Sequence, residues 1–261
     1  MRDLLNDLSE GLSHADPIRR AQIQMKRPLP KRFYKNATVA ESGDDFAIEL
    51  DGRPVRTPAR QLLVVPTKAL AELVATEWQR QIDVVDPGTM PVTRLVNTAL
   101  DGVATDRQAV FEDILRFSAT DLVCYRAEGP ANLVARQSDR WDPVIDWAAQ
   151  DLGARFILAE GVIHQEQPRE AVAAFAVSLR KYDTALELAS LHTITTLTGS
   201  ALLALAFAEG RFPLDEIWSL AHLDEDWTIE HWGRDEEAEQ RRTKRFEDFQ
   251  AAVDVFSALR S

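Results

Sequence analysis

The feature that most constrains the fold is an 18-residue run, residues 191–208, that contains no Asp, Glu, Lys or Arg. A helix that is apolar on every side has to be surrounded by protein or by lipid. Threonines, His192, Gly199 and Ser200 interrupt this run, and they make it too polar for a membrane span. The sequence therefore predicts a buried core helix that starts near Asp183, passes through Gly199 and is covered by other helices.

Residues 31–65 carry the signals of β-strands. Phe46, Ile48 and Leu50 alternate with polar or small residues, as one face of a strand requires. Asp51 and Gly52 follow directly and form a strong hairpin signal. Together with expected strands at 33–40 and 62–65, this pattern predicts a small antiparallel sheet.

Helical spacing dominates after residue 66. Apolar residues recur at intervals of three and four within 67–80, 92–100, 105–117, 132–152 and 168–182. Pro143 lies inside the fourth segment, where it either kinks the helix or starts a new one. Residues 156–165 are predicted to form a hairpin. The expected class is α+β, with a flexible lead-in at 1–30, a small β domain with one helix at 31–85, and an α-helical domain at 86–261.

Composition excludes several classes of function. The formal net charge of −12 argues against nucleic acid or an anionic membrane as the main partner. The single cysteine, Cys124, excludes an internal disulfide, and its apolar neighbours favour a small buried side chain. The first residues show no cleavable targeting signal. These observations predict a protein of a reducing compartment, with no membrane insertion.

The sequence lacks the usual signatures of catalysis. It contains no glycine-rich phosphate loop and no nucleophile elbow. His222 and His231 lie nine residues apart, which is not the spacing of a zinc-binding helix. We therefore expect no cofactor and no metal. The sequence favours binding over turnover.

Residues 215–239 form an acidic segment that carries ten acids and one base, Arg234. If residues 215–232 form one helix, a single stripe collects Ile217, Leu220, Ala221, Asp224, Trp227, Thr228, His231 and Trp232. Asp224 falls in the middle of this apolar stripe. An unpaired buried charge costs several kcal/mol or more, so this carboxylate is either paired inside the protein or presented to another molecule. We favour the second reading.

The tryptophans and the last helix add further expectations. Trp227 and Trp232 flank the acids. Each of them can either pack in the core or contact a partner, because tryptophan is favoured at interfaces. The other tryptophans are expected in the core: Trp78, Trp141, Trp147 and Trp218. In 235–260 the first half is charged and projects into solvent, whereas the apolar second half packs on the core. The basic cluster Arg241, Arg242, Lys244 and Arg245 is expected to pair with acids one turn earlier.

Seven segments, in order, carry a family resemblance: KRFYKN (31–36), ELDGRPVRTP (49–58), VATEW (74–78), TRLVNTALD (93–101), TDLVCYR (120–126), WDPVIDWA (141–148) and LDEDWTIEHWG (223–233). In these segments the chain resembles the assembly chaperones that attend the α subunit of the ATP synthase head in mitochondria and α-proteobacteria. The resemblance covers residues 31 to about 245.

The resemblance implies a small antiparallel β domain followed by a larger orthogonal α-helical bundle. It also implies an ATP-independent chaperone that binds the unassembled α subunit and prevents its aggregation until the β subunit takes over. In this family a carboxylate after the leucine of the last segment is functionally important, and here that position is Asp224. The family often has Glu there, so the shorter Asp224 is a departure.

The expected partner-binding residues are Asp224, Glu225, Asp226, Trp227, His231, Trp232 and Asp235, with aromatic anchors ringed by acids that meet basic groups of the partner. We expect a monomer in the bacterial cytoplasm that binds no nucleic acid. Two alternatives remain open. One is a soluble enzyme that uses the carboxylates around Asp224 for acid–base chemistry, which a deep pocket with a second carboxylate or His231 would support. The other is a permanent subunit of a larger complex.

Overall fold

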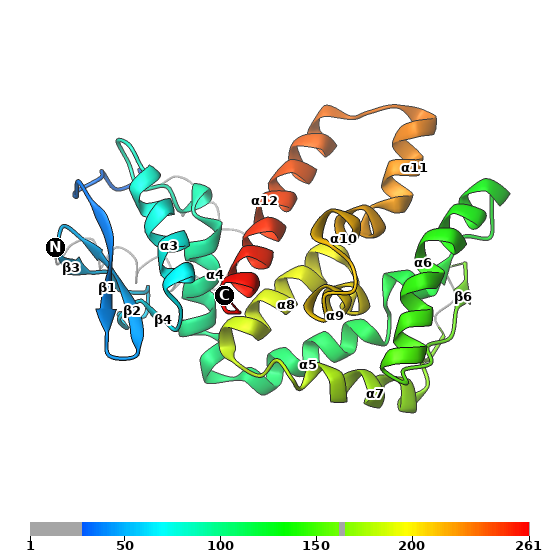
Figure 1. Cartoon of the computed structure of the whole chain (residues 1–261). Coiled ribbons are helices and arrows are strands. Elements are labelled where there is room, and N and C mark those ends of the chain that lie inside the picture. Colours follow the sequence, from blue (N-terminus) through cyan, green and yellow to red (C-terminus); the bar gives the residue numbers. More distant parts are fainter. Residues whose placement is uncertain (1–27, 162–164, 261) are drawn as a thin grey trace, which may run out of the picture.

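The computed structural model describes residues 28–161 and 165–260. A small β-sheet lies at one end of the molecule and the helices fill the rest (Figure 1). This arrangement confirms the predicted α+β class with a small antiparallel sheet. The predicted lead-in falls almost wholly on residues 1–27, which lie outside the described residues. The division at residue 85 stays a prediction, because a single core cluster runs from the sheet into the helices.

The sheet is built on one central strand. β2 (Asp45–Leu50) pairs antiparallel with β1 (Ala37–Ser42), and the short strands β3 (Arg53–Pro54) and β4 (Val64–Val65) also pair with β2. Ile48 and Leu50 are buried, as the alternation predicts. The face that they form is covered by α3 (Lys68–Arg80), whose first turn is capped by the hydroxyl of Thr67.

The helices that follow confirm the predicted segments 92–100, 105–117, 132–152 and 168–182, which correspond to α4 to α7. They are α4 (Pro91–Asp101), α5 (Arg107–Ser118), α6 (Ala131–Asp151), α7 (Arg169–Leu179), α8 (Ala185–Thr198), α9 (Ala201–Ala208), α10 (Leu214–Ala221), α11 (Leu223–Trp232) and α12 (Glu236–Ala258). Short 3-10 turns occur at η1 (Pro87–Thr89), η2 (Val103–Thr105) and η3 (Leu122–Cys124). Pro143 lies inside a continuous α6. α8 is the core helix, with α4, α5, α9 and α12 packed around it.

Two predictions of local structure outside the acidic segment were wrong. The core helix does not continue through Gly199, because this residue adopts φ +69° and ends α8, and the Ser200 hydroxyl then caps α9 at Leu203 N. Within the described part of 156–165, the strand β6 (Ala159–Glu160) pairs parallel with β5 (Tyr125–Arg126), so it is not part of a hairpin. A parallel partner lies too far along the chain for the local pattern to reveal it.

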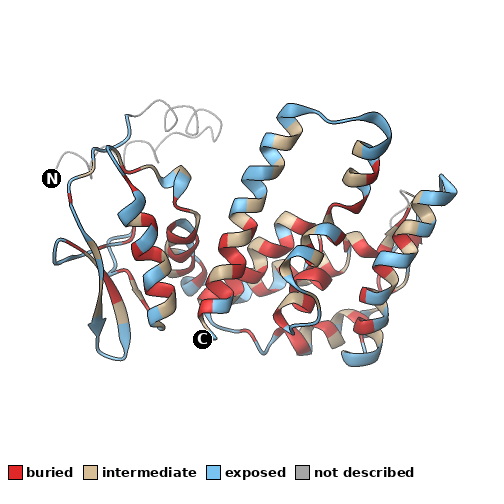
Figure 2. Ribbon diagram, turned by 45° about the horizontal axis from the view of Figure 1, so that its top comes forward, coloured by how far each residue is buried: buried red, intermediate tan, exposed pale blue. Residues whose placement is uncertain are grey.

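The two halves of α12 differ as predicted. The second half buries Phe249, Val253 and Phe256 in the core, whereas the first half is largely exposed (Figure 2). The Thr67 hydroxyl donates to Ala258 O, which ties this helix to the start of α3. No helix in the described part of the chain is long and apolar enough to cross a membrane.

Buried acids fix the joints between elements. Glu77 of α3 accepts hydrogen bonds from Val92 N and Thr93 N, so it caps α4, and burial raises the pKa of its carboxyl. Asp121 is fully buried, and it accepts from Val123 N and Leu202 N at 3.2 and 2.9 Å. It thereby holds η3 and the start of α9. Burial raises the pKa of Asp121 to about 6, against the opposing effect of its hydrogen bonds.

The side chain of Cys124 is buried, as predicted. Burial raises the pKa of its thiol, and the nearby Asp121 raises it further. Because the thiolate is the nucleophilic form, this residue is suited to packing and not to covalent chemistry.

Candidate functional site

The acidic segment begins with a break that the sequence pattern did not reveal. Residues 215–232 were predicted as one helix, but α10 ends at Ala221 with His222 as its C-cap, and α11 begins at Leu223. The His222 ring packs against the Trp218 ring at a tilt of 35°, with 3.9 Å between ring centroids, and its Nδ1 lies 2.9 Å from Trp218 O. Burial lowers the pKa of His222, so the ring is neutral at pH 7.

The break moves Asp224 out of the buried stripe. It lies in the first turn of α11 and is exposed to solvent. Gln137 Nε2 donates to Asp224 Oδ1 at 2.8 Å. Glu225 and Asp226 share this first turn, where the helix macrodipole favours carboxylates. Asp224 is therefore not enclosed in its own helical bundle, and a partner can reach it.

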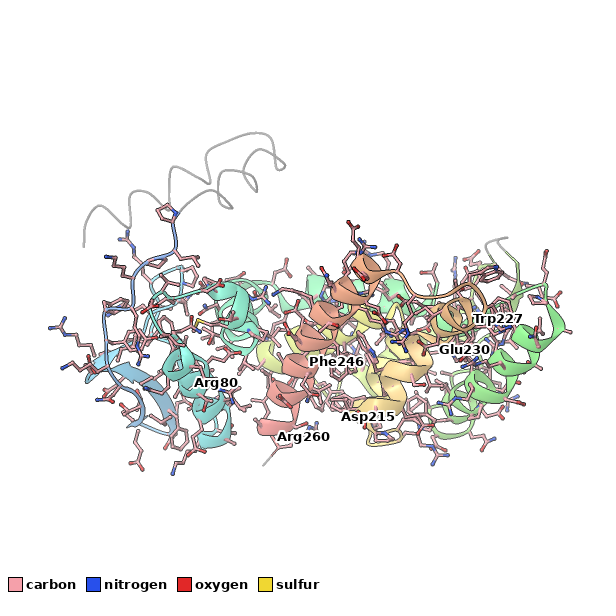
Figure 3. The ribbon with its side chains drawn as sticks, turned by 90° about the horizontal axis from the view of Figure 1, so that it is seen from above. Arg80, Asp215, Trp227, Glu230, Phe246 and Arg260 are labelled. Atoms are coloured by element: carbon pink, nitrogen blue, oxygen red, sulfur yellow. The ribbon has the colours of Figure 1, made fainter. Side chains whose placement is uncertain are left out.

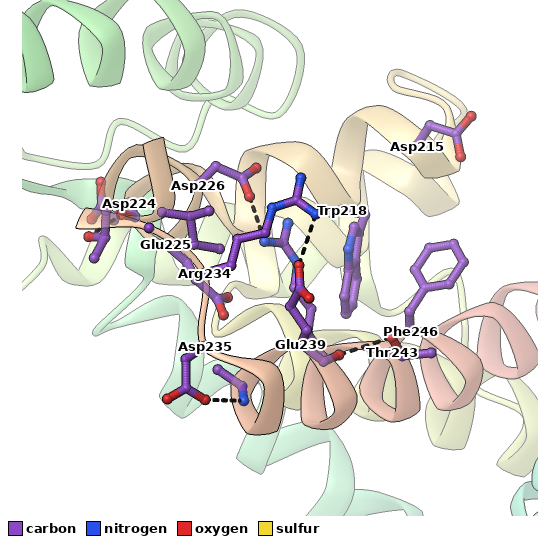
Figure 4. Close-up of a pocket in the computed structure, with 15 residues that line it drawn as sticks. Asp215, Trp218, Asp224, Glu225, Asp226, Arg234, Asp235, Glu239, Thr243 and Phe246 are labelled. Atoms are coloured by element: carbon purple, nitrogen blue, oxygen red, sulfur yellow. Dashed lines mark hydrogen bonds and ion pairs between the residues drawn. The ribbon is translucent and has the colours of Figure 1, made fainter. Parts of the chain in front are cut away.

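A groove of about 1080 Å³ runs between α11 and α12 (Figure 4). Thr228 and Ile229 form part of the α11 wall, and Thr243 and Phe246 form part of the α12 wall. Trp218 of α10 lies between them. The charged residues that line the groove are Asp215, Asp224, Glu225, Asp226, Arg234, Asp235, Glu239 and Arg242.

Both bases of the groove are already paired with its own acids. Arg242 contacts Asp226 at 2.5 Å and Arg234 contacts Glu239 at 3.1 Å. Asp235 accepts from Ala238 N and caps α12. Since six of the eight charged residues are acids, the groove carries an excess of negative charge that favours a cationic partner surface.

The aromatic residues predicted for the site form a separate cluster on α11. Trp227 is buried and stacks on His231, with 4.0 Å between ring centroids. Trp232 packs edge-on against Trp227 at 5.2 Å and is 72% exposed. None of the three lines the groove. Figure 3 shows Trp227 on the side of α11 near α6, away from Phe246 on α12.

The predicted site residues thus divide into two groups on neighbouring faces of α11. Asp224, Glu225 and Asp226 line the groove together with Asp235. We expected the acids to surround the aromatic anchors. Instead, the anchors lie beside the acids. A partner that uses both groups has to reach around α11.

Other residues of the site were not predicted. Arg136 on α6 holds Glu230 on α11 through two contacts of 2.6 and 2.9 Å. Gln137 holds Asp224, and Trp218 and Arg242 line the groove. Gln137 did leave a signal, since it falls on the apolar stripe of α6 four residues before the buried Trp141. The sequence carries no signal for the pairing of Arg136 with Glu230 or of Arg242 with Asp226.

The remaining predictions for this region have mixed outcomes. Trp141 and Trp147 are buried, whereas Trp78 and Trp218 are only half-buried against the core. In the basic cluster, Arg241 pairs with Glu237 on its own helix, as predicted. The others do not: Arg242 reaches α11, Lys244 donates to Gly88 O and Arg245 donates to Leu197 O.

The geometry gives no support to acid–base chemistry at Asp224. The residue is exposed and His231 does not line the groove. In the described part of the chain, the side chain that is hydrogen-bonded to its carboxylate is the amide of Gln137, which is not an acid or a base. Among residues 28–161 and 165–260, no group of three or more His, Cys, Asp or Glu side chains is placed to hold a metal ion.

The chain is similar to one family of proteins. The family model described as ATP12 chaperone protein matches residues 31–149. The mitochondrial protein atp12 of Schizosaccharomyces pombe is 23% identical over 236 residues, which cover 85% of this chain and 80% of that protein.

Two crystal structures are also similar. That of Atp12 from Paracoccus denitrificans is 37% identical with a TM-score of 0.81, and covers 88% of this chain and 98% of that one. That of the Atu1473 protein from Agrobacterium tumefaciens is 66% identical with a TM-score of 0.88, and covers 99% of this chain and 97% of that one.

Proposed function

The chain belongs to the ATP12 chaperone protein family, and we propose that it is an assembly chaperone for ATP synthase. Its client is the unassembled α subunit of the ATP synthase head, which it protects from aggregation until the β subunit pairs with it. The observation that carries this choice of surface is the exposed carboxylate of Asp224, held by Gln137 at the acidic groove.

The mechanism is one of holding and competition. An unassembled subunit exposes apolar interface surface that is prone to aggregate. The acidic groove speeds the encounter with a basic surface and selects for it, whereas an exposed aromatic such as Trp232 lengthens the residence time. The affinity has to be moderate, because the β subunit must displace the chaperone. No nucleotide hydrolysis is needed for such a release.

The proposal includes the other expectations of the sequence. The protein acts without catalysis, as a monomer in the bacterial cytoplasm. A permanent subunit would differ in a measurable way: it would co-purify with its partner in a fixed ratio and would not exchange. A pull-down from cells in which assembly of the ATP synthase head is blocked distinguishes the two, because a chaperone then accumulates on free α subunit.

Replacing Asp224 by Ala tests the proposed surface. We expect the variant to stay folded, because the side chain is exposed, with a denaturation midpoint lowered only by the loss of the bond from Gln137. Binding to the isolated α subunit should be roughly tenfold weaker. Titration calorimetry measures the affinity, and light scattering of warmed α subunit measures the protection from aggregation. Glu41→Ala removes an exposed carboxylate from β1 and serves as the matched control, with no effect expected.

Three results would argue against this account. An Asp224→Ala protein that protects the α subunit as well as the wild type does would remove the groove from the site. Equal losses in Asp224→Ala and Glu41→Ala would reduce the effect to overall charge. A wild-type protein that binds isolated β subunit but not α would show that the client is wrong.

A further inference from the structure

Asp224 stands between two hollows of the surface. It lines the groove described above, and it also lines a second hollow of about 660 Å³ on the side of α6. Leu122, Tyr125, Glu128 and Trp141 are part of the wall of this second hollow. A group bound at Asp224 can therefore extend into either space.

Gln137 fixes the carboxylate at this position. The residue is 2% exposed, and both ends of its amide are bonded. Gln137 Oε1 accepts from Ala127 N at 2.8 Å, and Nε2 donates to Asp224 Oδ1 at 2.8 Å. Because an amide N–H can only donate and an ionised carboxylate can only accept, these two partners allow a single orientation of the side chain.

The support beneath Gln137 is itself fixed. One turn later on α6, Trp141 Nε1 donates to Leu220 O at 2.9 Å, which holds α6 against the end of α10. Ala127 directly follows the strand β5. The amide thus bridges β5 and α11 from a buried helix face, an arrangement that preorganises a binding group.

The other carboxylate oxygen differs from Oδ1 in its contacts with the described residues. Oδ2 of Asp224 accepts no hydrogen bond from any described residue, whereas Oδ1 is occupied by Gln137. A carboxylate oxygen of an exposed residue, with no hydrogen bond from the described chain, suits the head of an arginine or lysine side chain. The half-buried Leu122 and Tyr125 offer apolar surface to its aliphatic stem.

We propose that Gln137 is a positioning residue for partner binding: it holds Asp224 so that Oδ2 receives one basic side chain of the client where the two hollows meet. This inference rests on the proposed function and adds to it the chemistry of one contact. The client supplies a single arginine or lysine at this point, and the carboxamide of Gln137 sets the geometry in which it is received.

A double-mutant cycle tests the role of Gln137. Gln137→Met keeps the length of the side chain and removes both polar ends. We expect Gln137→Met to weaken binding of the isolated α subunit about tenfold in the wild-type background and less than about twofold when Asp224 is already Ala. The coupled part of the loss should shrink at high salt. Gln137→Asn, which keeps the amide but cannot span both partners, should fall between wild type and Gln137→Met.

The outcomes separate this inference from the function on which it rests. Equal losses in both Asp224 backgrounds would show that Gln137 only supports the fold, and would overturn the inference alone. A wild-type protein that does not bind the α subunit would overturn both. If Gln137→Met fails to fold, the same cycle is run with Gln137→Asn. The inference then requires that Gln137→Asn weakens binding more in the presence of Asp224 than in the Asp224→Ala background, and equal losses would overturn it.

Discussion

Replacing Asp121 by Ala lowers the free energy of unfolding by about 3–5 kcal/mol. The carboxylate is fully buried, and two backbone N–H groups, those of Val123 and Leu202, donate to it. Alanine leaves these donors unpaired in the core, where the lost hydrogen bonds cannot be replaced by water. Urea denaturation followed by circular dichroism measures the change.

The matched control is Asp106→Ala. Asp106 is an exposed carboxylate that caps α5 through a bond from Ala109 N, so its loss should cost only about 1 kcal/mol. Equal effects of the two substitutions would show that Asp121 acts as an ordinary cap and that its burial adds nothing.

The pH dependence of stability carries a signature of the same residue. The pKa of Asp121 is raised from its ordinary value of 3.8 to about 6 in the folded protein, so the folded state binds this proton more tightly than the unfolded chain does. Its contribution to stability is therefore fully present below 3.8 and is lost as the pH rises through about 6. The size of the change is about 3 kcal/mol.

Asp121→Asn isolates this contribution, because asparagine does not titrate. The difference in unfolding free energy between the wild type and Asp121→Asn should increase in favour of the wild type as the pH is lowered from 7 to 4. A difference that stays constant over this interval would show that the carboxyl titrates alike in the folded and unfolded states.

Replacing Trp232 by Ala weakens binding of the α subunit about 30-fold, or 2 kcal/mol, while stability stays within about 0.5 kcal/mol. Its indole is 72% exposed and contacts Trp227 only by its edge, so the fold gains little from it. Large exposed aromatics are typical anchors of protein interfaces. Surface plasmon resonance should show the loss mainly as faster dissociation.

Val177→Ala is the control for this experiment. Val177 on α7 is 71% exposed, so it matches Trp232 in exposure but lies outside the proposed surface. We expect no change in affinity for this variant. A Trp232→Ala protein that binds as the wild type does would exclude the aromatic cluster from the interface and leave the acidic groove as the only candidate.

Much of the fold could be predicted because the periodicity of apolar residues is a local property. Ile48 and Leu50 on β2, and Phe249 and Phe256 on α12, are buried as their spacing predicts. At the break, His222 is buried and packs at a tilt against Trp218, and the periodicity of apolar residues does not report such a contact. The break at Gly199 was readable, since a glycine followed by a serine can end one helix and cap the next.

The candidate site was predicted in part, and Asp224 was singled out on a premise that was wrong. We expected a charge on a continuous apolar stripe, whereas the residue is exposed because α10 and α11 are separate helices. The same search for polar residues on apolar stripes would have found Gln137 on α6. The pairing of Arg242 with Asp226 could not be predicted, because many nearby acids are equivalent partners in the sequence.

The position of α12 has a consequence for biosynthesis. This helix packs on α4 and α8, and Arg94 on α4 contacts Asp248, which follows 154 residues later in the chain. Contacts between such distant segments form slowly, because a long stretch of chain has to close first. The segment up to Phe256 therefore has to leave the ribosome before α12 can pack on α4 and α8. Until then, the faces of α4 and α8 that α12 covers stay exposed in the nascent chain. Exposed apolar surface of this kind makes incomplete chains prone to aggregate.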